Sequence, residues 1–187
     1  MSRRFPQLRQ DQLNEQQKPL ADQVMKVSSV GIGGPYNLLL RSPVLGQRMF
    51  DLFDYLRWKT SVETRLNEFA ILIVGRQWRS QVEWAAHAPL ALKAGLAPQI
   101  VADLKASKRP ANMPPEEAVV YDFVTELTTK HAVSDETYDR AKRLLGEQQV
   151  VDLTAVAGGY VTIAMILAMS EMTVPPGREE PFKPGEP

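Results

Sequence analysis

A nearly unbroken apolar segment, Val150 to Met169, constrains the fold more than any other feature of the sequence. Its 20 residues are nearly enough to span a bilayer. Three polar residues and a glycine pair interrupt it, namely Asp152, Thr154, Thr162 and Gly158-Gly159. No basic residues lie close to its ends. We therefore predict a helix buried on every side rather than a membrane span, and in so small a protein an oligomer interface is the natural place to bury it.

The rest of the chain also carries helical signals. Ser42 and Pro43 fit the N-cap and first position of a helix, Thr60 to Glu63 has capping-box spacing, and Gly95 fits a helix C-terminus. Glycine and proline content predicts loops at 30–35 and 108–115, and a break at 75–78. The expected helices cover about 11–28 (on the surface), 43–58, 60–74, 79–94, 98–107, 116–131, 135–146 and 148–170. Since period-2 alternation is absent, the predicted fold is all-α.

Composition limits the classes of function. The 187 residues fit one domain, 1–187, with an N-terminal extension over 1–29 and a proline-rich tail over 175–187 that we expect to be extended or mobile. Lys plus Arg and Asp plus Glu are 22 each, so no net field favours nucleic acid or an anionic membrane. Cysteine is absent, which excludes disulfides, thiolate metal sites and thiol catalysis. The first residues lack the apolar stretch of a signal peptide, so a cytoplasmic location is expected.

The candidate chemistry is concentrated between Glu68 and Gly95. On a helix, Ser80, Glu83 and His87 stand at i, i+3 and i+7 and so share a face. Glu83 and His87 are also within reach of a carboxylate–imidazole hydrogen bond. Glu68 lies one helix earlier among apolar residues, where desolvation would raise its pKa unless a partner offset it.

Structural explanations of the same residues remain open. A Glu–His pair four residues apart on a helix is commonly a surface or core contact, and Glu68 could pair with Arg65 or Arg76. Only one other histidine, His131, exists, so we expect no bound metal. Nothing resembles the nucleophile elbow of a serine hydrolase.

The block from Glu68 to Leu96 resembles the core motif of the carboxymuconolactone decarboxylase family, within the alkylhydroperoxidase D-like superfamily. The peroxidase branch carries Glu, eleven residues, Cys, two residues, Cys, three residues and His. Glu68 and His87 occupy the Glu and His positions, while Ser80 and Glu83 replace the cysteines. Further segments resemble the longer, cysteine-free members, namely 34–43, 133–138 and the Gly158 to Tyr160 helix.

This resemblance implies an all-helical fold around a helical hairpin, assembling as a dimer, trimer or hexamer. It also implies a cofactor-free lyase that removes carbon dioxide from a small carboxylated lactone or a related intermediate of aromatic catabolism. His87 would move the proton, oriented by Glu83 and coupled to Glu68, with Ser80 beside them. Substrate-binding residues are expected at Tyr36, Trp84, Tyr160 and Arg79, with Arg76 or Arg79 pairing with the carboxylate.

Two other functions stay open at this point. The same Glu and His could serve an isomerase or hydrolase, or they could be structural remnants in a non-enzymatic helical oligomer. Thiol-dependent peroxide reduction is excluded, because neither Ser80 nor Glu83 can supply the thiolate or the resolving thiol.

Overall fold

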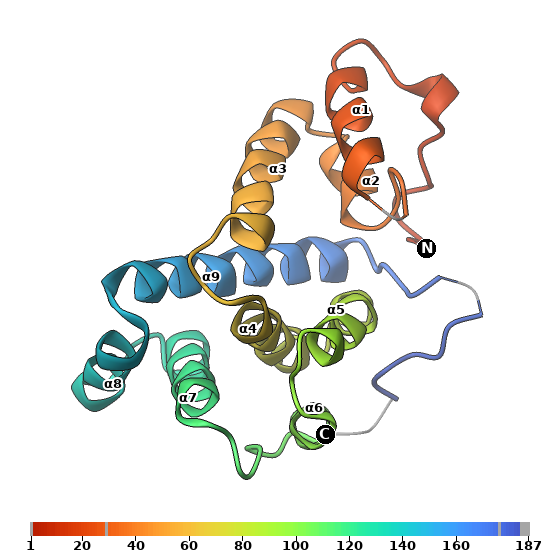
Figure 1. Ribbon diagram of the computed structural model, residues 1–187. Coiled ribbons are helices and arrows are strands. Elements are labelled where there is room, and N and C mark those ends of the chain that lie inside the picture. The colour runs from red at the N-terminus through yellow and green to blue at the C-terminus, as the bar shows by residue number, and fades with distance from the viewer. Residues whose placement is uncertain (1, 29, 176, 184–187) are drawn as a thin grey trace.

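A computed structural model describes residues 2–28, 30–175 and 177–183 (Figure 1). The described residues form helices and loops, with one isolated antiparallel bridge between Ser2 and Met172. After a 3-10 turn at Gln10–Gln12, the elements are α1 (Lys18–Val27), α2 (Pro35–Leu39), α3 (Pro43–Trp58), α4 (Thr64–Gln77), α5 (Gln81–Lys93), α6 (Pro98–Lys105), α7 (Pro115–Thr129), α8 (Asp135–Leu145) and α9 (Glu147–Met169). The predicted all-α class is confirmed.

The α4–α5 hairpin lies at the centre of the molecule. Helix α4 is buried at every position from Leu66 to Arg76, because it packs against α5, α7 and α9 at once. Figure 1 shows α9 crossing the middle, with α4, α5 and α7 on one side and α3 on the other. The hairpin and α9 therefore enclose the residues that the sequence singled out.

Several helix boundaries match the prediction. Helix α3 begins with Ser42 as N-cap and Pro43 at the first position, although the Ser42 side chain makes no capping bond. Helix α5 continues through Pro89 and is followed by Gly95 at φ +98°, a conformation that glycine adopts without strain.

Other boundaries differ from the prediction. Helix α4 begins at Thr64 with Glu63 as N-cap, so the capping box at Thr60 is wrong. The Thr60 hydroxyl instead accepts the Val62 N–H and donates to Asp152. The break after α4 lies at 78–80 rather than 75–78, with Arg79 at φ +49°.

The N-terminal extension forms a small hydrophobic cluster of its own. In place of one surface helix over 11–28 there is the 3-10 turn and the shorter α1, and α1 buries Leu20, Ala21 and Val24. The cluster also includes Leu13, Ile32 and Leu40. Helix α2, which the sequence did not predict, is tied to the extension because Asn37 accepts the Leu8 N–H and donates to the Phe5 and Pro6 carbonyls. The extension thereby fixes the position of α2.

Part of the proline-rich tail packs on the hairpin. Phe182 is only 3% exposed and lies edge-on to Trp84, with ring centroids 5.2 Å apart. Its backbone N–H and C=O both bond the Gln81 side chain, at 2.9 and 2.6 Å. The tail is irregular, as expected, but Phe182 anchors it; residues 176 and 184–187 of that prediction lie outside the described residues.

Helix α9 is buried on one side. Tyr160, Ile163 and Leu167 are buried, whereas Val151, Met165 and Met169 are 68%, 51% and 49% exposed. Its length and composition would suffice to cross a membrane, and half of its most apolar stretch is covered within the molecule. One chain therefore does not bury this helix on every side, and oligomerisation stays a prediction.

Candidate functional site

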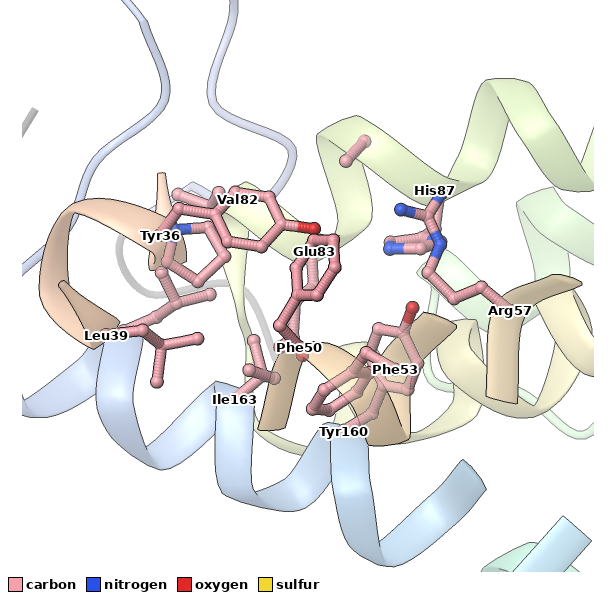
Figure 2. A pocket seen from close by; sticks show the side chains of 13 residues that line it. Tyr36, Leu39, Phe50, Phe53, Arg57, Val82, Glu83, His87, Tyr160 and Ile163 are labelled. Atoms are coloured by element: carbon pink, nitrogen blue, oxygen red, sulfur yellow. The ribbon is translucent and has the colours of Figure 1, made fainter. Parts of the chain in front are cut away.

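A cavity of about 90 Å³ lies between the α4–α5 hairpin, α9, α3 and the start of α2 (Figure 2). It far exceeds the ~15 Å³ that one water molecule needs. It is smaller than the ~300 Å³ of most drug-sized ligand pockets. Its walls are Pro35, Tyr36, Leu39, Phe50, Phe53, Arg57, Val82, Glu83, Ala86, His87, Tyr160, Ile163 and Leu167. The cavity is therefore suited to a small molecule.

Glu68 and His87 form a buried pair beside this cavity. His87 Nδ1 lies 2.6 Å from Glu68 Oε2, and both side chains are only 9% exposed. The turn between α4 and α5 brings together two groups that lie 19 residues apart in the sequence. With Glu68 ionised, the imidazole Nδ1–H donates to it, which leaves Nε2 as the ring nitrogen that can exchange a proton with a ligand.

Glu83 is buried but not hydrogen-bonded. The residue is 3% exposed and lines the cavity, and neither of its carboxyl oxygens has a hydrogen-bond partner among the described residues. The predicted Glu83–His87 hydrogen bond is thus wrong, because His87 bonds Glu68 instead. Burial raises the pKa of Glu83 to about 7, and the nearby Ser80 hydroxyl opposes this only in part. At neutral pH Glu83 can therefore give or take a proton.

Ser80 contributes little to the cavity. It is the N-cap of α5 rather than part of the helix, and it does not line the cavity. Its buried hydroxyl has no hydrogen-bond partner among the described residues. Its effect on the pKa of Glu83 comes from proximity. Of the three residues predicted to share a helix face, only Glu83 and His87 line the cavity.

Two tyrosines face the same cavity. The Tyr160 ring packs edge-on to His87 at 5.1 Å and to Phe53 at 5.4 Å between centroids. Burial raises the pKa of both Tyr160 and Tyr36 above the usual range. Both hydroxyls consequently keep their protons at neutral pH and can donate hydrogen bonds. Figure 2 shows the Tyr160 hydroxyl near His87, whereas Tyr36 lies beside Val82, on the side of the cavity away from Arg57.

Trp84 and Arg79 do not line this cavity, although both were predicted to bind substrate. Trp84 packs on Phe182, while the Arg76 and Arg79 guanidinium groups lie 5.1 and 5.9 Å from the centre of the same ring. Arg76 also donates to the Lys105 carbonyl and Arg79 to the Lys183 carbonyl. Neither arginine therefore serves the cavity.

The cation that lines the cavity is Arg57, which sequence reasoning missed. It lies on α3 with Phe50 and Phe53, at i, i+3 and i+7, so all three share a helix face. The only sign of this role in the sequence is that Arg57 follows two aromatic residues, Phe50 and Phe53, on the same face of a predicted helix.

The described residues do not form a recognisable set of metal ligands. Among residues 2–28, 30–175 and 177–183, no three His, Asp or Glu side chains gather closely enough to hold an ion. Glu68, Glu83 and His87 are instead arranged as a hydrogen-bonded pair and a separate carboxyl group.

The chain was compared with family models, curated proteins and solved structures, and a solved structure with a similar fold was found. No family model matches the sequence, and no curated protein matches it either. Among solved structures, the chain is similar to an alkylhydroperoxidase AhpD core, an uncharacterized peroxidase-related protein from Ralstonia eutropha, with a TM-score of 0.77 and 14% identity over 92% of both chains. The chain thus adopts the alkylhydroperoxidase D-like helical fold, without a cysteine.

Proposed function

We propose that this protein is an acid–base enzyme that acts on a small molecule in the cavity between Glu83, His87 and Tyr160. One observation carries the proposal: Glu83 is buried at the cavity wall without a hydrogen-bond partner among the described residues, beside the Glu68–His87 pair. A carboxyl group left unpaired and desolvated costs stability, and such groups concentrate at functional sites.

The specific reaction that we propose is decarboxylation of a small carboxylated lactone or a related intermediate of aromatic catabolism. The bond between the carboxylate and the ring carbon breaks, carbon dioxide leaves, and the electron pair delocalises into the unsaturated ring system. A proton from Glu83 or from protonated His87 then adds to carbon, and water returns the proton to the enzyme. The Tyr36 and Tyr160 hydroxyls stabilise the negative charge that develops on the lactone.

An isomerase or hydrolase is the alternative that uses the same groups. Isomerisation needs a base to remove a proton and an acid to return it, for which His87 Nε2 and Glu83 are suitably paired. Hydrolysis needs a base to activate water. In the non-enzymatic alternative, a helical oligomer would retain Glu68 and His87 as structural remnants.

A panel of small carboxylated lactones and their uncharged esters separates these reactions. Carbon dioxide release supports the lyase, double-bond migration without mass loss supports the isomerase, and ring opening supports the hydrolase. His87→Ala should abolish any turnover while the helical circular-dichroism spectrum is kept. His131→Asn is the matched control, because His131 is exposed, does not line the cavity and is the only other histidine in the sequence. Absence of all three reactions would contradict an enzymatic role.

The proposal also covers the oligomeric state of the protein and its location in the cell. We propose a cytoplasmic homo-oligomer whose interface covers the exposed side of α9, because Val151, Met165 and Met169 would otherwise face water. Light scattering should give a mass well above 20.9 kDa, and a monomer at micromolar concentration would contradict this. Peroxide reduction with a dithiol should not exceed a buffer blank, since the chain has no thiol.

A further inference from the structure

Arg57 supplies a positive charge to the polar side of the cavity. It reaches the cavity from α3, and Figure 2 shows it on the side where His87 and the Tyr160 hydroxyl lie. The same residue borders a second, smaller cavity of about 10 Å³ together with Val27, Asp54 and Trp58.

The charge of Arg57 is not matched within the described part of the chain. Its buried Nε atom has no hydrogen-bond partner, and no described carboxylate forms an ion pair with it. Asp54, one turn earlier on α3, pairs with Lys59 instead. The Arg57 guanidinium rests on the Trp58 ring at 4.6 Å, which orients it without neutralising it.

Neither acid group of the site pairs directly with Arg57. Glu68 bonds His87, and neither carboxyl oxygen of Glu83 has a hydrogen-bond partner among the described residues. A half-buried guanidinium without a counter-ion is unfavourable, and an anion bound at the same place would relieve the cost. Guanidinium also matches a carboxylate in shape, because its planar N–H groups can donate two parallel bonds.

The other end of the cavity is apolar. Leu39, Phe50, Ile163 and Leu167 line it, and Figure 2 places the labelled Leu39 and Ile163 away from Arg57. A ligand that fills the cavity would therefore have one charged end and one hydrocarbon end. The cavity volume of about 90 Å³ restricts such a ligand to a small molecule.

We propose that Arg57 is a specificity-determining residue that selects small monoanions with an apolar body by pairing with their carboxylate. The inference rests on the proposed function, because it assigns the substrate class of the same cavity. The carboxylate would then bind to Arg57 on α3 rather than to Arg76 or Arg79, which contact Phe182 and Lys183 of the tail.

Binding of simple acids and their amides tests this without turnover. The probes are crotonate, 2-furoate and benzoate, each compared with its uncharged amide by ligand-observed NMR and calorimetry. We expect at least one carboxylate to bind the native protein about tenfold more tightly than its amide. Arg57→Gln should abolish that preference and leave amide binding within about twofold. Because the amide reports on the intact cavity, a variant that merely unfolds is recognised by loss of both ligands.

Arg48→Gln is the matched control. Arg48 lies on the same helix, is exposed and lines no part of the cavity, so its loss removes the same charge without touching the site. Its carboxylate preference should stay as in the native protein. Equal binding of acid and amide, no binding of any probe, or an equal loss of preference in both variants would overturn the role of Arg57.

These results are separable from those for the proposed function. If carboxylates bind through Arg57 but no lactone reacts, the anion site stands and the enzymatic proposal fails. If a lactone reacts with the same KM in native protein and Arg57→Gln, the enzymatic proposal stands and this inference fails.

Discussion

Replacing Glu83 with Gln should change how the stability of the protein depends on pH. The side chain is 3% exposed and its pKa is raised by burial from 4.5 to about 7. The folded protein therefore holds this proton more tightly than the unfolded chain does. Stability from this group is complete below about 4.5 and falls as pH rises, until the loss is complete above about 7.

The size of this effect follows from the same pKa difference. It corresponds to about 3 kcal/mol in total, of which about 2 to 3 kcal/mol falls between pH 5 and pH 8. The amide of glutamine has nearly the same shape and does not titrate in this range. Glu83→Gln should therefore be more stable than the native protein at pH 8, and the difference should shrink at pH 5.

Urea unfolding of both proteins at pH 5, 6, 7 and 8 measures this directly. Subtracting the two free energies of unfolding removes the contributions of all other titrating groups that the substitution leaves unchanged. If the native protein and Glu83→Gln lose stability in parallel across this range, Glu83 is not a desolvated carboxyl group. The reasoning that links it to the cavity would then be refuted.

Three further predictions concern the scaffold around the site. Asp152→Asn should lose about 2 kcal/mol at neutral pH, because this carboxylate accepts bonds from Tyr55, Thr60 and Ser61. Burial alone would raise the pKa of Asp152, but these bonds hold it below 3.8. The loss of thermal stability in Asp152→Asn relative to the native protein should therefore become smaller as pH falls below that value. A loss that does not depend on pH would contradict this. Gly46→Ala should lower the free energy of unfolding by about 1 to 3 kcal/mol, since a Cβ would lie 2.7 Å from the Leu39 carbonyl oxygen. Gly158→Ala, where a Cβ would have no atom within 4 Å, should raise it by about 0.5 to 1 kcal/mol. Equal effects of the two substitutions in denaturant titrations would argue against the close approach at Gly46. Phe182→Ala should lose about 2 to 4 kcal/mol and speed amide exchange in α5, and an unchanged exchange pattern would show that the tail is not anchored.

The sequence was informative at several helix ends, where local spacing decides structure, although the capping box that it predicted at Thr60 was wrong. Ser42, Pro43 and Gly95 mark helix ends correctly because caps depend on the nearest few residues. The Glu68 and His87 positions could be proposed because the hairpin motif fixes their spacing, and the structure places them 2.6 Å apart.

Contacts between distant segments were beyond this reasoning. The i, i+4 spacing favoured a Glu83–His87 hydrogen bond. In the structure, His87 bonds Glu68 on the facing helix instead, and Glu83 has no hydrogen-bond partner among the described residues. Arg57 comes to the cavity only because α3 packs across α9, a crossing that no local pattern encodes. Phe182 was overlooked because its segment is rich in proline, whereas its burial depends on Trp84 far away in the chain.

The central claim is that Glu83 and the Glu68–His87 pair move protons to and from a bound small molecule. Its most direct test is turnover of carboxylated lactones in deuterium oxide, with carbon dioxide and deuterium at the former carboxyl carbon measured together. We predict that native protein and His131→Asn release carbon dioxide and place one deuterium on that carbon, while His87→Ala and Glu83→Gln do neither above the buffer rate. Equal deuterium incorporation by His87→Ala, or release no faster than buffer for every lactone tested with native protein, would contradict the claim.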